Sequence, residues 1–226
     1  MDGKIFMVAT PIGNLQDISE RALETLRSVD VIACEDTRVT AKLLTSYGIS
    51  KPLFLLREYT QPASLDRLIE RVRAGENVAC VCDAGTPNMN DPGGRLAKAA
   101  FENGFTIVPI PGPSALTAAI SVCGIDIQDF RYYGFVPNKK GRKTMFKEIA
   151  DSKNPSIYLE STHRIDKTME QMSEVMDPNR IIFVGRELTK LHETLYRGTC
   201  AEVMAMLKTT STKGEFTIIV GPKPKG

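Results

Sequence analysis

The sequence predicts an α/β protein made of two α/β domains. Short apolar runs alternate with stretches of helical periodicity along most of the 226 residues. Pro111-Gly112-Pro113 interrupts this alternation near the middle of the chain, just before a helix of small residues. We therefore place a boundary there, with an N-terminal α/β domain at 1–112 and a C-terminal α/β domain at 113–226.

The N-terminal half predicts a mostly parallel sheet. Its strand segments are residues 4–9, 31–34, 53–56, 78–82 and 106–110. The helical segments between them are residues 19–27, 40–47, 65–74 and 96–103, several of them closed by a glycine. Strands that alternate with helices in this way form parallel sheets with both faces covered.

The C-terminal half predicts a second α/β set. Its helices are expected at residues 114–122, 144–150, 165–176 and 201–207, and its strands at 130–136, 157–160, 181–185 and 216–220. Residues 194–198 are interpreted as a turn region. A loop rich in lysine and arginine separates the first strand of this set from the next helix.

Composition narrows the class of protein. The 29 basic and 27 acidic residues leave a net charge of +2, too small to indicate a general nucleic-acid binder. No apolar run has membrane-spanning length, and the N-terminus does not resemble a secretory signal. The five cysteines show neither CxxC nor metal-ligand spacing, so we expect buried, reduced thiols, no metal site and a cytoplasmic location.

The loops that follow predicted strands are the places to look for chemistry. Ligands of open α/β sheets bind beyond the carboxyl ends of the strands. Four such loops are rich in glycine, proline and small polar residues: 9–15, 35–38, 83–87 and 111–115. Each alone is compatible with an ordinary tight turn, but together they favour a ligand site. Neither GxGxxG nor GxxxxGK[ST] occurs, so a dinucleotide or P-loop site is not supported.

An ordered set of motifs over nearly the whole chain resembles one family. The motifs are Val8-Ala9-Thr10-Pro11-Ile12-Gly13-Asn14-Leu15, Cys34-Glu35-Asp36-Thr37-Arg38, Asp83-Ala84-Gly85-Thr86-Pro87, Pro111-Gly112-Pro113-Ser114-Ala115, Glu160-Ser161-Thr162-His163-Arg164, Arg186-Glu187-Leu188-Thr189-Lys190 and Lys213-Gly214-Glu215-Phe216. They resemble the tetrapyrrole-methylase-like (class III) methyltransferases, in particular the branch that methylates 16S ribosomal RNA.

The resemblance implies a fold, a cofactor and partners. S-adenosylmethionine (SAM), the methyl donor, would bind in the cleft between the two domains of a homodimer. The substrate would be the 2′-hydroxyl of a cytidine in 16S rRNA of the 30S subunit. The positions that match donor contacts of the family are Pro11, Ile12, Asp83, Gly85, Thr86, Met89, Ser114, Ala115, Leu159, Leu188 and Phe216.

Methyl transfer to a ribose hydroxyl needs alignment of two reactants and removal of a proton, but no metal. The candidate catalytic residues are Asp36, Glu58, Glu187, Lys190 and His192, with Glu193 as a further acid. The carboxylates could equally form structural ion pairs with nearby arginines. Lys190 could orient the attacking hydroxyl or lower its pKa. The sequence selects no single base among them.

The densest basic run is Lys139-Lys140-Gly141-Arg142-Lys143. Such runs are often solvated loops, but the RNA substrate implied by the resemblance favours phosphate contact. The predicted RNA-binding residues are Arg38, Lys139, Lys140, Arg142 and Arg164. Arg57 and Arg186 could either contact RNA or anchor loops.

Three positions depart from the family pattern, one of them Thr162, which stands before His163 where family members have proline. Asn88-Met89-Asn90 replaces an aliphatic–serine pair, and Tyr59-Thr60 follows Arg57-Glu58 where family members have His-Asn. Many members also carry about fifty further residues as a C-terminal helical domain. Two alternatives therefore stay open: methylation of a corrin or porphyrin precursor, and a SAM-binding, ribosome-associated module without turnover.

Overall fold

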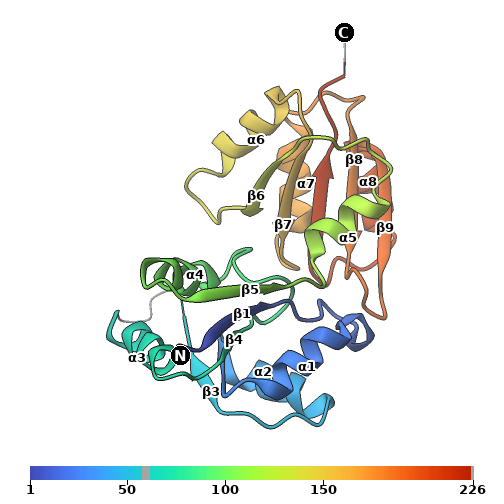
Figure 1. Ribbon diagram of the computed structural model, residues 1–226. Coiled ribbons are helices and arrows are strands. Elements are labelled where there is room, and N and C mark those ends of the chain that lie inside the picture. The colour runs from blue at the N-terminus through green and yellow to red at the C-terminus, as the bar shows by residue number, and fades with distance from the viewer. Residues whose placement is uncertain (58–61, 225–226) are drawn as a thin grey trace. The chain divides into compact units, whose positions relative to one another are not determined.

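The computed structural model describes residues 1–57 and 62–224, and Figure 1 shows its course. The chain divides into two compact units, Met1–Ser114 and Ala115–Gly226. Each unit contains its own five-stranded sheet. The predicted α/β fold class is confirmed.

The sheet of the first unit is parallel throughout, as the alternation of strands and helices predicted. Its strand order is β3-β2-β4-β1-β5. The strands are β1 (Lys4–Val8), β2 (Val31–Cys34), β3 (Leu53–Leu55), β4 (Val78–Cys80) and β5 (Thr106–Ile110). The helices are η1 (Leu15–Asp17), α1 (Glu20–Ser28), α2 (Thr37–Ser46), α3 (Pro62–Arg73) and α4 (Gly93–Glu102).

Both faces of this sheet are buried, because helices cover each of them. Val31 and Ala33 of β2 join a core formed with α3 and α4, whereas Ile32 and Cys34 join a core formed with α1 and α2. Figure 1 shows these two helix pairs on opposite sides of the sheet. Burial of successive residues on alternate faces explains the continuous apolar runs of the parallel strands. The loops at the strand ends are therefore held by a rigid layer.

The second unit has a mixed sheet of order β6-β7-β10-β8-β9, in which only β6 and β7 run parallel. Its strands are β6 (Arg131–Phe135), β7 (Ser156–Glu160), β8 (Ile181–Arg186), β9 (Thr194–Thr199) and β10 (Phe216–Val220). Its helices are α5 (Ala115–Val122), α6 (Arg142–Asp151), α7 (Ile165–Ser173) and α8 (Cys200–Lys208).

The interpretation of residues 194–198 as a turn region is wrong. Thr194–Thr199 forms the edge strand β9 and pairs with all six residues of β8 in antiparallel register. Burial alternates along it, since Tyr196 is buried whereas Leu195 and Arg197 are exposed. The single inward-facing aromatic residue on an edge strand gives too short a period-2 pattern to be recognised in the sequence.

All five cysteines are buried and free, as the sequence predicted. Burial raises the pKa of Cys82 to about 12 and that of Cys200 to about 11. Such thiols are unreactive at neutral pH. Within residues 1–57 and 62–224, no helix is both long and apolar enough to cross a membrane.

Candidate active site

The loops that follow β1, β4 and β5 are hydrogen-bonded to one another. Thr10 and Gly85 form an isolated antiparallel bridge, with N–O distances of 2.9 Å and 3.0 Å. The Thr86 hydroxyl donates to the carbonyl oxygen of Pro113 at 3.1 Å. Three of the four loops that the sequence singled out therefore form one connected structure in the first unit. We call these loops, residues 9–14, 82–87 and 110–114, the strand-end loops.

Close backbone packing in the strand-end loops requires glycine at two positions. Gly85 has a φ of 90°, in the left-handed region that residues with a Cβ rarely adopt. A Cβ on Gly112 would lie only 3.0 Å from the Cβ of Ala9. Pro11 is buried beside these loops and Ile12 is half-buried. The exposed backbone at Gly112, beside apolar side chains, suits an adenosine ligand, which needs amide partners between apolar walls.

The segment Asn88-Met89-Asn90, which departs from the family pattern, is an ordered turn centred on Asp91. The Asp91 carboxylate accepts hydrogen bonds from the backbone N–H groups of Asn88, Met89 and Gly93, at 2.9, 3.2 and 2.8 Å. Asn88 and Asn90 have φ values of 76° and 118°. Asparagine tolerates such values better than most residues. Asn88 and Asn90 therefore suit the backbone of the turn that carries Met89. Sequence reasoning gave no role to Asp91.

The Asp36 carboxylate forms an ion pair with Arg38. It accepts from the backbone N, Nε and Nη2 of Arg38 at 2.8, 3.1 and 2.6 Å. These hydrogen bonds lower the pKa of Asp36 well below its usual range. A carboxylate so stabilised is a poor proton acceptor, so this contact favours the structural interpretation of Asp36. The Arg38 side chain is 87% exposed and stays available to a ligand.

Asp83 lies beside this pair. One of its carboxylate oxygens accepts from the backbone N of Asp36 at 3.2 Å, which links the loops after β2 and β4. Burial raises the pKa of Asp83, and this hydrogen bond only partly offsets the effect. Asp83 therefore holds together the two loops at the carboxyl ends of the neighbouring strands β2 and β4. Its predicted contact with SAM stays a prediction.

In the second unit, the ends of three strands bring together the other predicted SAM contacts. Phe216 at the start of β10 pairs with Glu160 at the end of β7 and with Arg186 at the end of β8. Leu159 therefore lies one residue away in the register, and Leu188 is the second residue after β8. Phe216 and Leu188 are buried in this unit, so both also have a packing role.

The loop after β8 holds a cluster of three charged residues. Lys190 Nζ donates to Glu187 Oε1 and to Glu215 Oε2, both at 2.9 Å. The backbone N of Glu215 donates to the same Glu187 oxygen at 2.8 Å. Glu187 and Thr189 have φ values of 51° and 67°, which are strained for residues with a Cβ. Strained backbone around a charged cluster is typical of functional loops.

The cluster fixes the charges of its members. Burial opposes the charged form of Lys190, but the hydrogen bonds to Glu187 and Glu215 outweigh it and raise the pKa of Lys190. Burial likewise opposes the charge on Glu187, yet the bonds from Lys190 and from the Glu215 backbone lower its pKa overall. Lys190 is therefore an ammonium and Glu187 a carboxylate at neutral pH. A protonated amine is a poor general base, so this contact favours a different role for Lys190.

This pairing predicts a pH-dependent contribution of Glu187 to stability. A group whose pKa is lowered on folding stabilises the protein above its unfolded pKa, and the benefit is lost as the pH falls through the folded pKa. The free-energy cost of Glu187→Gln, measured by urea unfolding, should be present at pH 7 and shrink from about pH 5 downward. Glu174→Gln, at an exposed position, is the control. A cost that is independent of pH would contradict the charge assignment.

A cavity of about 600 Å³ lies in the same unit. It is lined by Arg186, Leu191, His192, Glu193, Thr194, Ser211 and Lys213. Arg186 donates to the carbonyl oxygens of Lys213 and His192 at 2.7 and 3.0 Å, and so fixes two walls of the cavity. Glu193 accepts from the backbone N of Thr189 at 2.6 Å. The predicted residue His192 is exposed at this cavity, which is within the usual size range of ligand sites.

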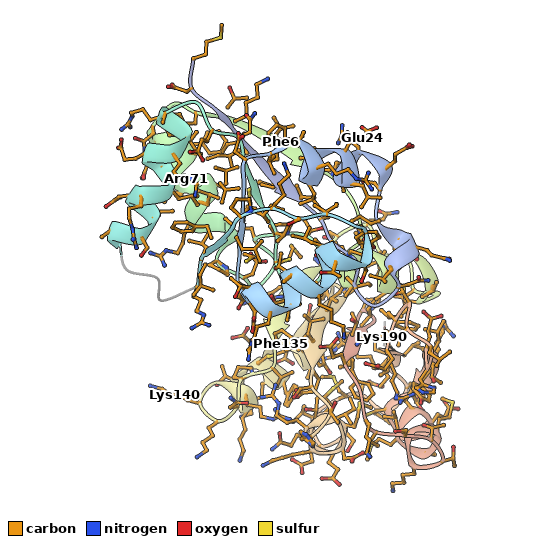
Figure 2. All side chains as sticks on the ribbon, turned by 90° about the horizontal axis from the view of Figure 1, so that it is seen from below. Phe6, Glu24, Arg71, Phe135, Lys140 and Lys190 are labelled. Carbon is orange, nitrogen blue, oxygen red and sulfur yellow. The ribbon has the colours of Figure 1, made fainter. Side chains whose placement is uncertain are left out.

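The predicted RNA-binding residues of the basic run differ in their exposure to solvent. Lys139 and Lys140 are exposed, and Figure 2 shows Lys140 projecting away from the ribbon. Arg142, by contrast, is only 5% exposed. Its Nη1 lies 3.4 Å from the Glu160 carboxylate, and its Nε donates to Gln171 at 2.5 Å. Burial of this guanidinium contradicts the prediction that Arg142 contacts RNA.

The basic run in the sequence does not reveal that Arg142 forms an ion pair with Glu160. Glu160 is fully buried at the end of β7, and nothing in its local sequence indicates that two arginines bind it. Arg164 is the second of them and is partly exposed.

The candidate base Glu58 lies outside the described residues. Ser114 and Ala115 are the last residue of the first unit and the first of the second.

The comparisons with known proteins identify the class. The family model of the tetrapyrrole (corrin/porphyrin) methylases matches residues 4–204. The chain belongs to this family, which confirms the resemblance that its motifs predicted. The structure of a cobalamin biosynthetic enzyme, cobalt precorrin-4 methyltransferase, superposes with a TM-score of 0.70 and 17% identity. That match covers 96% of this chain and 94% of the other, and it confirms the fold.

Within the family, the chain is similar to one particular group of enzymes. Ribosomal RNA small subunit methyltransferase I of Haemophilus influenzae is 43% identical over 228 residues, which cover 100% of this chain and 81% of the relative. The protein of the same name from Thermotoga maritima is 38% identical over 221 residues, or 98% of this chain and 99% of the relative.

Proposed function

We propose that this protein uses SAM to methylate the 2′-hydroxyl of a cytidine ribose in the 16S rRNA of the small ribosomal subunit. The observation that carries this proposal is the identity of 43% and 38%, over essentially the whole chain, to relatives named ribosomal RNA small subunit methyltransferase I. The reaction would take place in the cytoplasm on the 30S subunit, and the protein would act as a homodimer.

The residues present suit SAM as the methyl donor. When bound, SAM supplies a methyl group on a positively charged sulfur. The strand-end loops offer exposed backbone at Gly112, where a Cβ would be crowded. Pro11 and Ile12 supply apolar surface beside them. We propose that SAM also contacts three apolar residues, Leu159, Leu188 and Phe216. The remaining proposed contacts are Asp83, Thr86, Met89, Ser114 and Ala115.

Proton removal is assigned to residues after β8. Asp36 is committed to Arg38, and Lys190 is held as an ammonium. His192 is exposed at the 600 Å³ cavity, and histidine is the residue most often used as a general base. We propose that the acceptor ribose enters this cavity, that His192 takes the hydroxyl proton, and that the Lys190 ammonium stabilises the developing charge on oxygen.

The test is a methyl-transfer assay with three acceptors. The protein is incubated with SAM labelled in the methyl group and with 30S subunits, free 16S rRNA or a porphyrin precursor. We expect label in the RNA of 30S subunits, as a nucleoside whose 3′ phosphodiester resists alkali because its 2′-hydroxyl is blocked. Label only in the porphyrin precursor would favour the family's other chemistry. SAM binding without transfer to any acceptor would favour a module without turnover.

A further inference from the structure

A buried carboxylate in the second unit binds two arginines. Glu160, at the end of β7, has no exposed surface. Its Oε1 lies 2.6 Å from Arg164 Nη2 and accepts from the backbone N of Ser161 at 2.8 Å. Its Oε2 accepts from the Thr168 hydroxyl at 2.5 Å and lies 3.4 Å from Arg142 Nη1. Every contact belongs to the same unit, so the arrangement is independent of the first unit.

Both arginines also bind the loop that begins after β6. Arg142 Nη1 donates to the carbonyl oxygen of Pro137 at 3.4 Å. Arg164 Nη1 donates to the side-chain oxygen of Asn138. Arg142 is itself the first residue of α6, and Gly141 before it has a φ of 88°. The segment Lys139-Lys140-Gly141 is therefore anchored at both ends, by Asn138 and by Arg142.

We propose that Glu160 positions the phosphate-binding loop of this protein, by holding Arg142 and Arg164 so that they fix the exposed Lys139 and Lys140. This inference rests on the proposed function, because it takes RNA as the ligand of these lysines. Glu160, Arg164 and Asn138 are positioning residues, whereas the lysines make the contacts. No motif in the sequence assigned such a role to a carboxylate or to Asn138.

Charge and entropy both support this arrangement. Two buried or half-buried guanidinium groups share one carboxylate, so the group keeps an excess positive charge at the two residues that precede the lysines, Pro137 and Asn138. Such a charge attracts phosphate without exposing more arginine. A loop fixed before binding also loses less conformational entropy when it meets RNA. The energetic benefit of the loop therefore depends on its anchors as well as on its lysines.

Asn138→Ala tests the anchor without changing any charge. The probe is single-stranded polyuridylate, whose affinity is measured at several salt concentrations and does not depend on methyl transfer. We expect Asn138→Ala to bind about threefold more weakly, because the lysines must be ordered on binding. The salt slope should stay near that of the wild type, because the lysines still contact phosphate once bound, whereas the Lys139→Ala/Lys140→Ala variant loses about 0.7 per phosphate contact. Asn154→Ala, in which the lost partner is Asp129, is the matched control.

Glu160→Gln separates positioning from the general electrostatic field. This variant gains one positive charge, so a field effect alone predicts tighter binding of polyuridylate. Positioning predicts the opposite, about fivefold weaker binding, because the arginines lose their shared carboxylate. SAM affinity and the thermal unfolding midpoint, measured in parallel, report whether the fold is intact. If Glu160→Gln does not fold, the comparison of Asn138→Ala with Asn154→Ala decides.

The outcomes for the two proposals differ. Tighter binding by folded Glu160→Gln, equal binding by Asn138→Ala and Asn154→Ala, or no binding of polyuridylate by the wild type would overturn the positioning role. Failure to methylate 30S subunits while Asn138→Ala still weakens polyuridylate binding would refute the proposed function alone. Methylation by the wild type with unchanged affinity in both variants would refute the positioning role alone.

Discussion

Replacing Arg180 with methionine is expected to lower the free energy of unfolding by about 3–5 kcal/mol. Arg180 is only 1% exposed. Its guanidinium donates to four carbonyl oxygens: Ile149, Ala150, Ser152 and Gly221, at 2.7, 2.8, 3.0 and 2.8 Å. It thereby joins the end of α6 to the chain that follows β10. Methionine fills similar space but leaves these buried acceptors without their donors.

Arg197→Met is the matched control for this substitution. Arg197 belongs to the same unit and also donates to a carbonyl oxygen, that of Gly124 at 3.1 Å, but it is exposed. Water can replace its hydrogen bond, so the expected cost is below about 1 kcal/mol. Urea unfolding of both variants provides the comparison. Equal costs for the two arginines would show that the burial of Arg180 does not determine its contribution.

Replacing Lys190 with methionine is expected to lower kcat for RNA methylation about 10²-fold while SAM affinity stays near that of the wild type. The ammonium is held 2.9 Å from both Glu187 and Glu215, in the same loop as Leu191 and His192, which line the cavity that we assign to the acceptor ribose. Its removal takes away the positive charge proposed to stabilise the developing oxyanion. It also leaves two carboxylates without their cation, which should raise the pKa of Glu187.

Two further variants make the Lys190 experiment specific. Lys208→Met removes an exposed lysine at the end of α8 and should leave kcat unchanged. Lys190→Arg keeps the charge with a different geometry and should restore part of the rate. Multiple-turnover kinetics with saturating 30S subunits give kcat, and equilibrium dialysis gives SAM affinity. A kcat for Lys190→Met within twofold of the wild type would exclude the proposed role.

The sequence predicted those parts of the fold that repeat a strong local pattern. The strands Val31–Cys34, Thr106–Ile110 and Phe216–Val220 were located to the residue. They are bounded runs of mainly β-branched residues, two of them buried throughout. The edge strand β9 was missed because only Tyr196 and Gly198 face inward there. Its pairing with β8 depends on contacts that local sequence does not describe.

The candidate site was predicted less completely, because charge pairing is a property of the folded chain. Lys139 and Arg142 belong to the same basic run, yet one is exposed and the other is bound to the distant Glu160. The carboxylates Glu160 and Asp91 received no role, although each organises a loop. Only the resemblance to a family could select SAM, because backbone contacts leave little trace in residue type.

The burial of every native thiol makes this protein easy to label at a chosen point. Thiol-directed reagents react with exposed, ionised cysteines, and all five cysteines here are buried. A cysteine introduced at the exposed position of Lys140 would then be the preferred target in the folded protein. A fluorophore attached there would report the arrival of RNA at the loop directly, without any need to remove the native cysteines first.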